Sequence, residues 1–208
     1  MDTELAALTA PLREGATQRR PGRPRSEAAG QAMLDAALEA IAECGLEGVT
    51  CEDVAARAGV GKATLYRRWS GKEDLLIAAF ASLKTPLPEP QGGNVRDDLI
   101  AMLDVVARDA NDPRHARQFS LLHGEGARFP RLVARYKEEV VEPRRELIRQ
   151  VLRRGAETGE LREDTDIEVA MLALSGAVIS REKHDQTPAA TDFAQRVVDE
   201  LLRGIAAR

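Results

Sequence analysis

The sequence predicts an all-α protein in which a small N-terminal three-helix domain precedes a larger C-terminal helical domain. Aromatic residues make up only 3% of the chain and charged residues 31%, a composition that favours helices over strands. Apolar residues recur at helical spacing along most of the chain, and no segment alternates as a strand would. The proline- and glycine-rich stretch KTPLPEPQGGN, residues 84–94, interrupts this pattern and indicates a domain boundary.

The chain begins with a segment that we expect to be a flexible basic arm. Residues 1–25 contain several prolines and little periodicity, and they end in the run RRPGRPR. Ser26 is expected to cap a helix that runs to about residue 44, where Gly45 and Gly48 end it. The apolar residues of this helix fall on one face: Met33, Leu34, Ala37, Leu38 and Ile41.

Two short helices follow, over residues 51–58 and 62–69, with the glycine turn GVG between them. Thr50, with an acid three residues later, has the pattern of a capping box at the start of the first. Ser70 and Glu73 repeat that pattern before the next helix. Two short helices joined by a tight turn are typical of a helix-turn-helix motif.

The C-terminal part is predicted to consist of five helices. They are expected to cover residues 95–110, 113 to about 124, 130–159, about 165–181 and about 191–206. Thr165 and Glu168 form the expected cap of the fourth of these helices. Pro143 lies inside the long third helix, so a kink is expected there.

Positive charge gathers around the GVG turn, although the whole chain carries a formal net charge of −4. On a helical wheel, Leu65 and Trp69 share the buried face of the helix over 62–69, and Ala63 and Arg67 point the opposite way. An exposed arginine can donate two hydrogen bonds to guanine, and a small alanine permits close approach to the bases. The motif is therefore predicted to place this helix in the major groove of DNA.

Other residues around this helix are expected to contact the DNA backbone or the minor groove. Lys62 begins the helix, where phosphate is favoured, and the basic arm resembles an AT-hook that fits a narrow minor groove. The alternatives are a solvated charged face and a solubilising tail. The predicted DNA-contacting residues are Arg23, Arg25, Thr50, Lys62, Ala63, Thr64, Tyr66, Arg67, Arg68 and Lys72.

The stretch VTCEDVAARAGVGKATLYRRWSGKEDLL, residues 49–76, resembles the DNA-binding signature of the tetracycline-repressor (TetR) family of bacterial transcription regulators. Two departures from the family pattern, Gly61 and Trp69, are acceptable as a helix cap and a core aromatic. The resemblance implies a DNA-binding domain over residues 26–83 and an effector-binding, dimerising domain over 84–208. It also implies a ligand-responsive repressor, released from a palindromic operator by a small-molecule effector.

The C-terminal domain offers candidate residues for effector binding and for dimerisation. Small residues in AMLALSGAVIS and an apolar stripe along the final helix suit a homodimer through the last two helices; packing within one subunit is the alternative. His123 and Tyr136 are the first polar candidates for effector contact. The apolar candidates, for each of which plain core is the favoured alternative, are Met102, Leu103, Val106, Phe119, Leu122, Phe129, Leu132 and Met171.

Other functional classes are weakly supported by the sequence. The three histidines are scattered, and no phosphate loop, nucleophile elbow or metal-ligand cluster appears, so no enzymatic activity, metal or cofactor is expected. No apolar run is long enough to cross a membrane, and two cysteines suit a cytoplasmic protein. An architectural DNA-binding protein without an effector, and a protein-interaction module, remain as alternatives.

Overall fold

The computed structural model describes residues 23–184 and 191–205, and all the regular structure in this part of the chain is helical. The elements are α1 (Arg23–Gly48), α2 (Cys51–Arg57), α3 (Lys62–Tyr66), α4 (Lys72–Ser82), α5 (Val95–Ala110), α6 (Pro113–Gly124), the 3-10 turn η1 (Gly126–Arg128), α7 (Pro130–Tyr136), the π-helical turn η2 (Lys137–Val141), α8 (Glu142–Thr158), α9 (Ile167–His184) and α10 (Phe193–Ile205).

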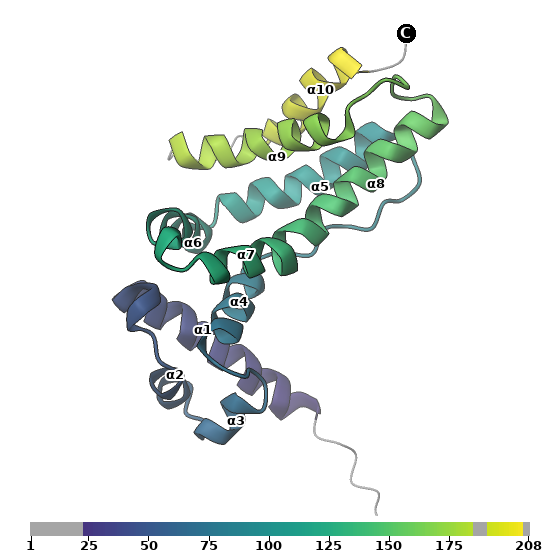
Figure 1. Cartoon of the computed structure of the whole chain (residues 1–208). Coiled ribbons are helices and arrows are strands. Elements are labelled where there is room, and N and C mark those ends of the chain that lie inside the picture. The colour runs from purple at the N-terminus through teal and green to yellow at the C-terminus, as the bar shows by residue number, and fades with distance from the viewer. Residues whose placement is uncertain (1–22, 185–190, 206–208) are drawn as a thin grey trace, which may run out of the picture.

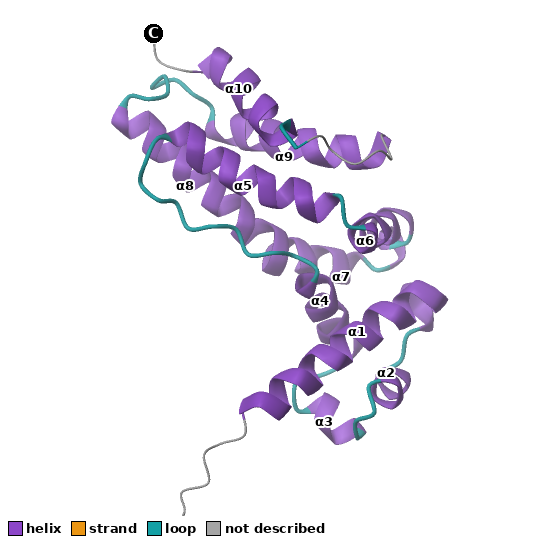
Figure 2. Cartoon of the chain, turned by 180° about the vertical axis from the view of Figure 1, so that it is seen from behind, coloured by secondary structure: helices purple, strands orange, loops and turns teal. Residues whose placement is uncertain are grey.

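The helices form a head and a body. Figures 1 and 2 show α1–α4 at one end of the molecule and α5, α8, α9 and α10 at the other, with α6 and α7 between them. The short α3 lies at the end of the head that is remote from α9 and α10. This arrangement agrees with the predicted all-α class and with a three-helix unit followed by a connecting helix and a larger helical part.

The first helix begins earlier than predicted and is interrupted where it was predicted to end. It begins at Arg23, three residues before the expected Ser26 cap, so the last residues of the predicted flexible arm are helical. The rest of the arm, residues 1–22, lies outside the described residues. Near the other end Gly45 has the non-helical backbone angles φ 69° and ψ −177°, so the regular helix is interrupted at the glycine predicted to end it, and a short helical stretch follows to Gly48.

Helix caps follow the predicted chemistry in some places and depart from it in others. The Thr50 hydroxyl accepts the Asp53 amide at 3.1 Å, as predicted. The expected Ser70–Glu73 box is wrong, because the Asp74 carboxylate accepts the backbone amide of Ser70 instead. The expected Thr165–Glu168 cap is also wrong: at the start of α9, Asp166 accepts the backbone amide of Val169 at 3.0 Å. At α4 the cap position is Gly71, which has no side-chain hydrogen bond, and at α9 the capping residue is the neighbour of the one predicted.

The predicted long helix over 130–159 is divided by a π-helical turn. The turn occupies Lys137–Val141 and lies just before Pro143, which is in the first turn of α8. Proline has no amide hydrogen and its ring crowds the carbonyl four residues earlier, so a wider turn relieves the clash. The disturbance that Pro143 predicted is therefore present, as a separation of α7 from α8.

Two hydrophobic clusters form the interior, and they divide the chain differently from the sequence boundary. One contains the apolar faces of α1–α4, but Leu132 and Tyr136 of α7 belong to it as well. The other is built mainly from α5, α8, α9 and α10. In the first cluster the Phe80 and Tyr136 rings meet edge to face with centroids 6.0 Å apart. Helix α7 is therefore a structural part of the head, although it follows the connector.

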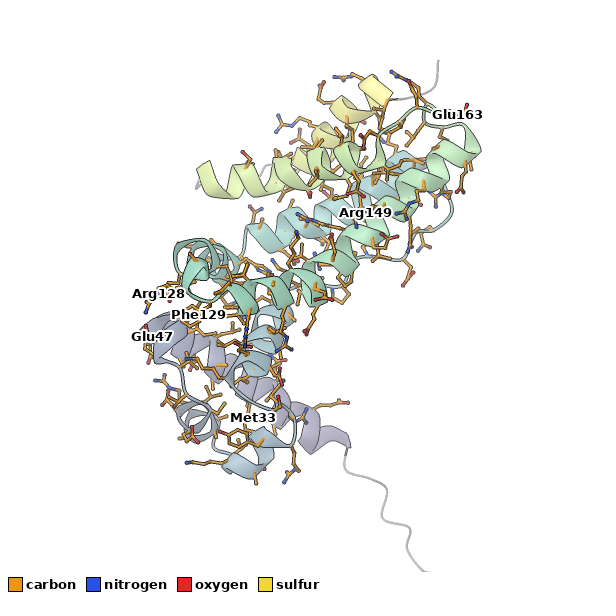
Figure 3. All side chains as sticks on the ribbon, in the orientation of Figure 1. Met33, Glu47, Arg128, Phe129, Arg149 and Glu163 are labelled. Carbon is orange, nitrogen blue, oxygen red and sulfur yellow. The ribbon has the colours of Figure 1, made fainter. Side chains whose placement is uncertain are left out.

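Polar contacts join the same segment to the head. The Glu125 carboxylate accepts the Leu46 amide at 3.2 Å, just after the break at Gly45. Arg128 pairs with Glu47, and Figure 3 shows these side chains close together with Phe129 beside them. Further along, Arg135 Nη1 lies 2.8 Å from Asp74 of α4. Each pair is partly exposed and contributes little stability, so these contacts chiefly define the orientation of α6 and α7 on the head.

Candidate nucleic-acid interface and ligand cavity

Helix α3 is anchored to the head by one face. Leu65 is fully buried, and Trp69, just beyond the helix, packs against the same cluster. The preceding turn depends on Gly59, whose φ of 65° is rarely adopted by residues with a side chain. The helix ends at Tyr66, three residues earlier than predicted, and Gly61 occupies the cap position without a side-chain hydrogen bond. Because Leu65 and Trp69 both face the head cluster, the buried face of α3 agrees with the helical-wheel prediction.

The opposite edge of α3 faces solvent. Ala63 and Arg67 are both exposed, and Thr64 beside them is half-buried. Arg67 Nη2 donates to the Thr64 hydroxyl at 3.1 Å, a contact that steadies the guanidinium at the surface. An exposed, oriented guanidinium next to a methyl group is the combination that reads guanine and thymine edges in a major groove.

An acidic residue lies at the rim of this surface. Lys62 Nζ is 3.5 Å from a Glu52 carboxylate oxygen, to which the exposed Tyr66 hydroxyl donates at 3.4 Å. A hydrogen bond from its own backbone amide and the nearby Lys62 ammonium hold the pKa of Glu52 below its usual value. Lys62 therefore offsets the charge that would otherwise repel a phosphate there.

The other predicted DNA contacts surround α3. Lys72 Nζ donates to the Glu47 backbone carbonyl at 2.7 Å, and Thr50 is exposed although its hydroxyl serves as a cap. Arg68 is exposed and lies against Gly30 of α1, where a Cβ would be 2.9 Å from Nη1. Seven of the eight predicted residues between 50 and 72 are thus exposed or carry a cation beside α3. Arg23 and Arg25 lie in the first turn of α1, and their side chains are outside the described residues.

The body contains a cavity of about 780 Å³ next to the head. Its walls come from the connector after α4 and from α5, α6, η1, α7, η2, α8 and α9. Its size is within the range of sites for small organic ligands. Tyr136 lines the cavity and also contacts Phe80 of α4, so one residue touches both the cavity and the core of the head.

The predicted effector residues are only partly brought together. Val106, Leu122 and Tyr136 line the cavity. Met102, Leu103 and Met171 do not line the cavity, because they are almost fully buried in the body core. Leu132 is buried in the head cluster instead. Phe129 caps α7 and packs against the head cluster. The side chains of Phe119 and His123 lie outside the described residues.

The buried polar residues of this cavity were not among the predicted effector contacts. His115 and Gln118 are 2% and 3% exposed and line it from α6. Asp109 is buried beside them, accepts from the Thr85 amide, and lies 3.0 Å from Arg144 Nη2. Burial, with a smaller effect from nearby cations, lowers the pKa of His115 to about 4, so its ring is neutral at pH 7. Spacings of three and four residues place His115, Gln118 and Leu122 on one helix face, a signal that could have found them.

Two other site classes find no structural support in the described part of the chain. Within residues 23–184 and 191–205, no group of three or more histidine, cysteine, aspartate or glutamate side chains could hold a metal ion. Within the same ranges, no helix is both long and apolar enough to span a membrane.

Comparison with known proteins places both parts of the chain in one family. Residues 33–79 match the family of bacterial regulatory proteins of the tetR type, and residues 89–201 match the tetracyclin repressor-like C-terminal domain. An uncharacterized helix-turn-helix transcriptional regulator of Bacillus subtilis, YdeS, is 34% identical over 79% of this chain and 83% of its own length.

Solved structures agree with this assignment. The TetR-family transcription regulator SCO0332 is 30% identical, with a TM-score of 0.62, over 86% of this chain and 98% of that one. The regulator FadR of Bacillus subtilis, solved in complex with stearoyl-CoA, shares the fold, with 21% identity and a TM-score of 0.64 over 85% and 99% of the two chains. The chain therefore belongs to the TetR family of helix-turn-helix transcriptional regulators.

Proposed function

We propose that this protein is a ligand-responsive repressor in the cytoplasm, which binds a palindromic operator as a homodimer and leaves it when an effector occupies the body. The observation that carries the proposal is the two-sided α3. Leu65 is fully buried while Ala63 and Arg67 are exposed on the opposite edge, at the end of the molecule remote from α9 and α10. A helix held in this way can enter a major groove without disturbing its own anchor.

The proposed base contacts come from Arg67 and Ala63, with Thr64 beside them. Lys62, Tyr66, Arg68, Thr50 and Lys72 are proposed to contact phosphates around them, and the arginines of the N-terminal arm to lie in the adjacent minor groove. Phosphate contacts fix the register of the helix, whereas the two groove-facing residues select the sequence. Enzymatic activity is not part of the proposal.

The homodimer is proposed to form through α9 and α10. Val169 and Leu172 of α9 are 61% and 51% exposed, unusual for large apolar side chains. Beside them, Ala173 and Ala177 form a groove with apolar residues of α10. Small residues let a second copy of these helices approach closely, and a four-helix interface would bury the exposed leucine and valine. A dimer would present two α3 helices to one face of DNA.

Release by an effector requires a route from the cavity to the head, and α7 supplies it. Tyr136 lines the cavity and packs on Phe80, and Arg135 pairs with Asp74 of the same helix α4. We expect a ligand that displaces α7 to turn α4 and change the separation of the two α3 helices. Successive major grooves are roughly 34 Å apart, so a small change in that separation costs operator affinity. A coupling of about 1–3 kcal/mol is typical of such systems.

The experiment that tests the DNA-binding proposal is a binding titration of fragments from the gene's own neighbourhood, at two salt concentrations. Sequence-selective binding that weakens steeply with salt is expected. Equal binding to all fragments would favour an architectural protein, and no binding at low salt would refute the proposal. The effector proposal is tested by repeating the titration with any compound shown to bind the body; it fails if no such compound changes operator affinity.

The dimer proposal is tested separately by sedimentation equilibrium. The unaltered protein is expected to sediment as a dimer at micromolar concentration, and Leu172→Arg as a monomer with unchanged helix content. Arg153→Ala, on the outer face of α8, is the control and should remain dimeric. A monomeric unaltered protein would refute the homodimer, and a dimeric Leu172→Arg variant would place the interface elsewhere.

A further inference from the structure

The cavity holds an unusual pair of buried polar side chains. Among the described residues, no group hydrogen-bonds either ring nitrogen of His115 or either amide atom of Gln118. Both residues are more than nine-tenths buried and both line the cavity from the same face of α6. Buried polar atoms without partners are costly and rare in folded proteins, so their presence at a cavity wall indicates a ligand that bonds to them.

The two side chains define what kind of polar group they can hold. The Gln118 amide offers N–H donors, and a neutral imidazole offers one N–H donor from His115. These donors lie on the same wall, three residues apart on one helix, which suits a single head group with two oxygen acceptors. The acceptor atoms of the two side chains are available to a hydroxyl or amide hydrogen elsewhere on the ligand.

The charge around the cavity selects among such head groups. Its described lining contains four cationic side chains, Lys84, Lys137, Arg144 and Arg145, and one carboxylate, Asp109. Asp109 is already paired with Arg144 and accepts the Thr85 amide, so it is not available to a cationic ligand. Arg145 lies 3.8 Å from Glu142, which is not among the lining residues, but the side chains that line the cavity still carry more positive than negative charge. A negative head group gains from this excess and a positive one loses.

Most of the remaining lining is apolar. Leu87, Val106, Leu122, Val133 and Ile148 contribute side chains from the connector and four helices. With a volume of about 780 Å³, the cavity has room for a hydrocarbon or aromatic body beyond the head group. Such a body gains from leaving water in proportion to its area.

We propose that the cavity binds an amphipathic organic anion, with a carboxylate-type head hydrogen-bonded by Gln118 and His115 and an apolar body against the apolar side chains of the lining. The proposal rests on the proposed function only in treating this ligand as the effector. Binding itself requires neither DNA nor a dimer, so the two can be tested apart.

The test compares three probes of equal chain length, decanoate, decan-1-ol and decylammonium, by calorimetric titration of the full chain at pH 7. Decanoate is expected to bind at least tenfold more tightly than decan-1-ol, and decylammonium most weakly. Gln118→Leu is expected to lower the affinity for decanoate about tenfold and to leave the affinity for decan-1-ol unchanged. The control is Gln150→Leu, the same change at an exposed site on α8. It should change neither the affinity for decanoate nor the affinity for decan-1-ol.

A second variant keeps the test decisive if Gln118→Leu does not fold. Lys84→Met preserves length and removes one positive charge from the lining, so it should weaken decanoate several-fold without affecting decan-1-ol. The proposal is overturned if decan-1-ol or decylammonium binds as tightly as decanoate, or if 1 mM decanoate gives no binding. Decanoate that binds as proposed but leaves operator affinity unchanged supports this inference and refutes the effector part of the proposed function.

Discussion

Acidification should destabilise this protein through His115. The ring is 2% exposed, and burial holds its pKa at about 4 in the folded chain against 6.5 ordinarily. The unfolded chain therefore takes up a proton first as the pH falls through 6.5, and stability contributed by the neutral ring is lost between pH 6.5 and about 4. At pH 5 the expected loss from this one residue is about 2 kcal/mol, because each pH unit corresponds to about 1.4 kcal/mol.

The assay is urea unfolding at pH 7 and pH 5, for the unaltered protein and for His115→Gln, which has similar size and does not titrate. Protonation of paired carboxylates such as Asp112 also destabilises the protein in acid. The useful quantity is therefore the difference between the two proteins in the unfolding free energy lost from pH 7 to pH 5. The unaltered protein should lose about 2 kcal/mol more than His115→Gln. Equal losses would show that His115 is not held neutral in the folded state, and the reasoning about its burial would be refuted.

Three further substitutions test the DNA-binding head. Leu65→Ala should lower the unfolding free energy by about 2–5 kcal/mol, because Leu65 is fully buried; a loss below about 1 kcal/mol in urea would contradict the anchor. Gly59→Ala should cost about 1 kcal/mol or more through its φ of 65° alone, since no atom lies within 4 Å of the added Cβ, and an unchanged Tm would contradict this. Lys72→Ala should weaken binding to all DNA sequences alike and reduce the salt slope by about one; a change in sequence preference would place Lys72 at the bases instead.

Local patterns predicted much of the fold. Helix α5 begins and ends at the predicted residues, Val95 and Ala110. Asn94 caps its start, and the polar residues that follow Ala110 end it. The buried and exposed faces of α3 also follow from residue spacing, because the helix is so short that its position in the sequence alone assigns each side chain to a face. The caps at Ser70 and Thr165 were wrong because two adjacent residues could each supply the bond, and sequence spacing does not choose between them.

The cavity was much harder to predict than the DNA-binding surface. Met102 and Met171 were reasonable candidates by composition, but their helices turn them into the body core. Which apolar side chains line a cavity depends on how eight separate segments meet, and local periodicity carries no information on that. The same long-range packing brings α7 into the core of the head, far in sequence from the helices that it joins.

The exposed edge of α3 is the part of the molecule on which the proposed DNA recognition rests, and one titration examines it. Operator fragments should be titrated with the unaltered protein, Arg67→Ala and, as a control for the lost charge, Arg108→Ala on α5. Arg67→Ala should lose about 1–3 kcal/mol of binding free energy and accept other bases at one position of each half-site, while its Tm stays unchanged. Arg108→Ala should bind as the unaltered protein does. Operator affinity and base preference that survive Arg67→Ala intact would contradict the placement of α3 in the major groove.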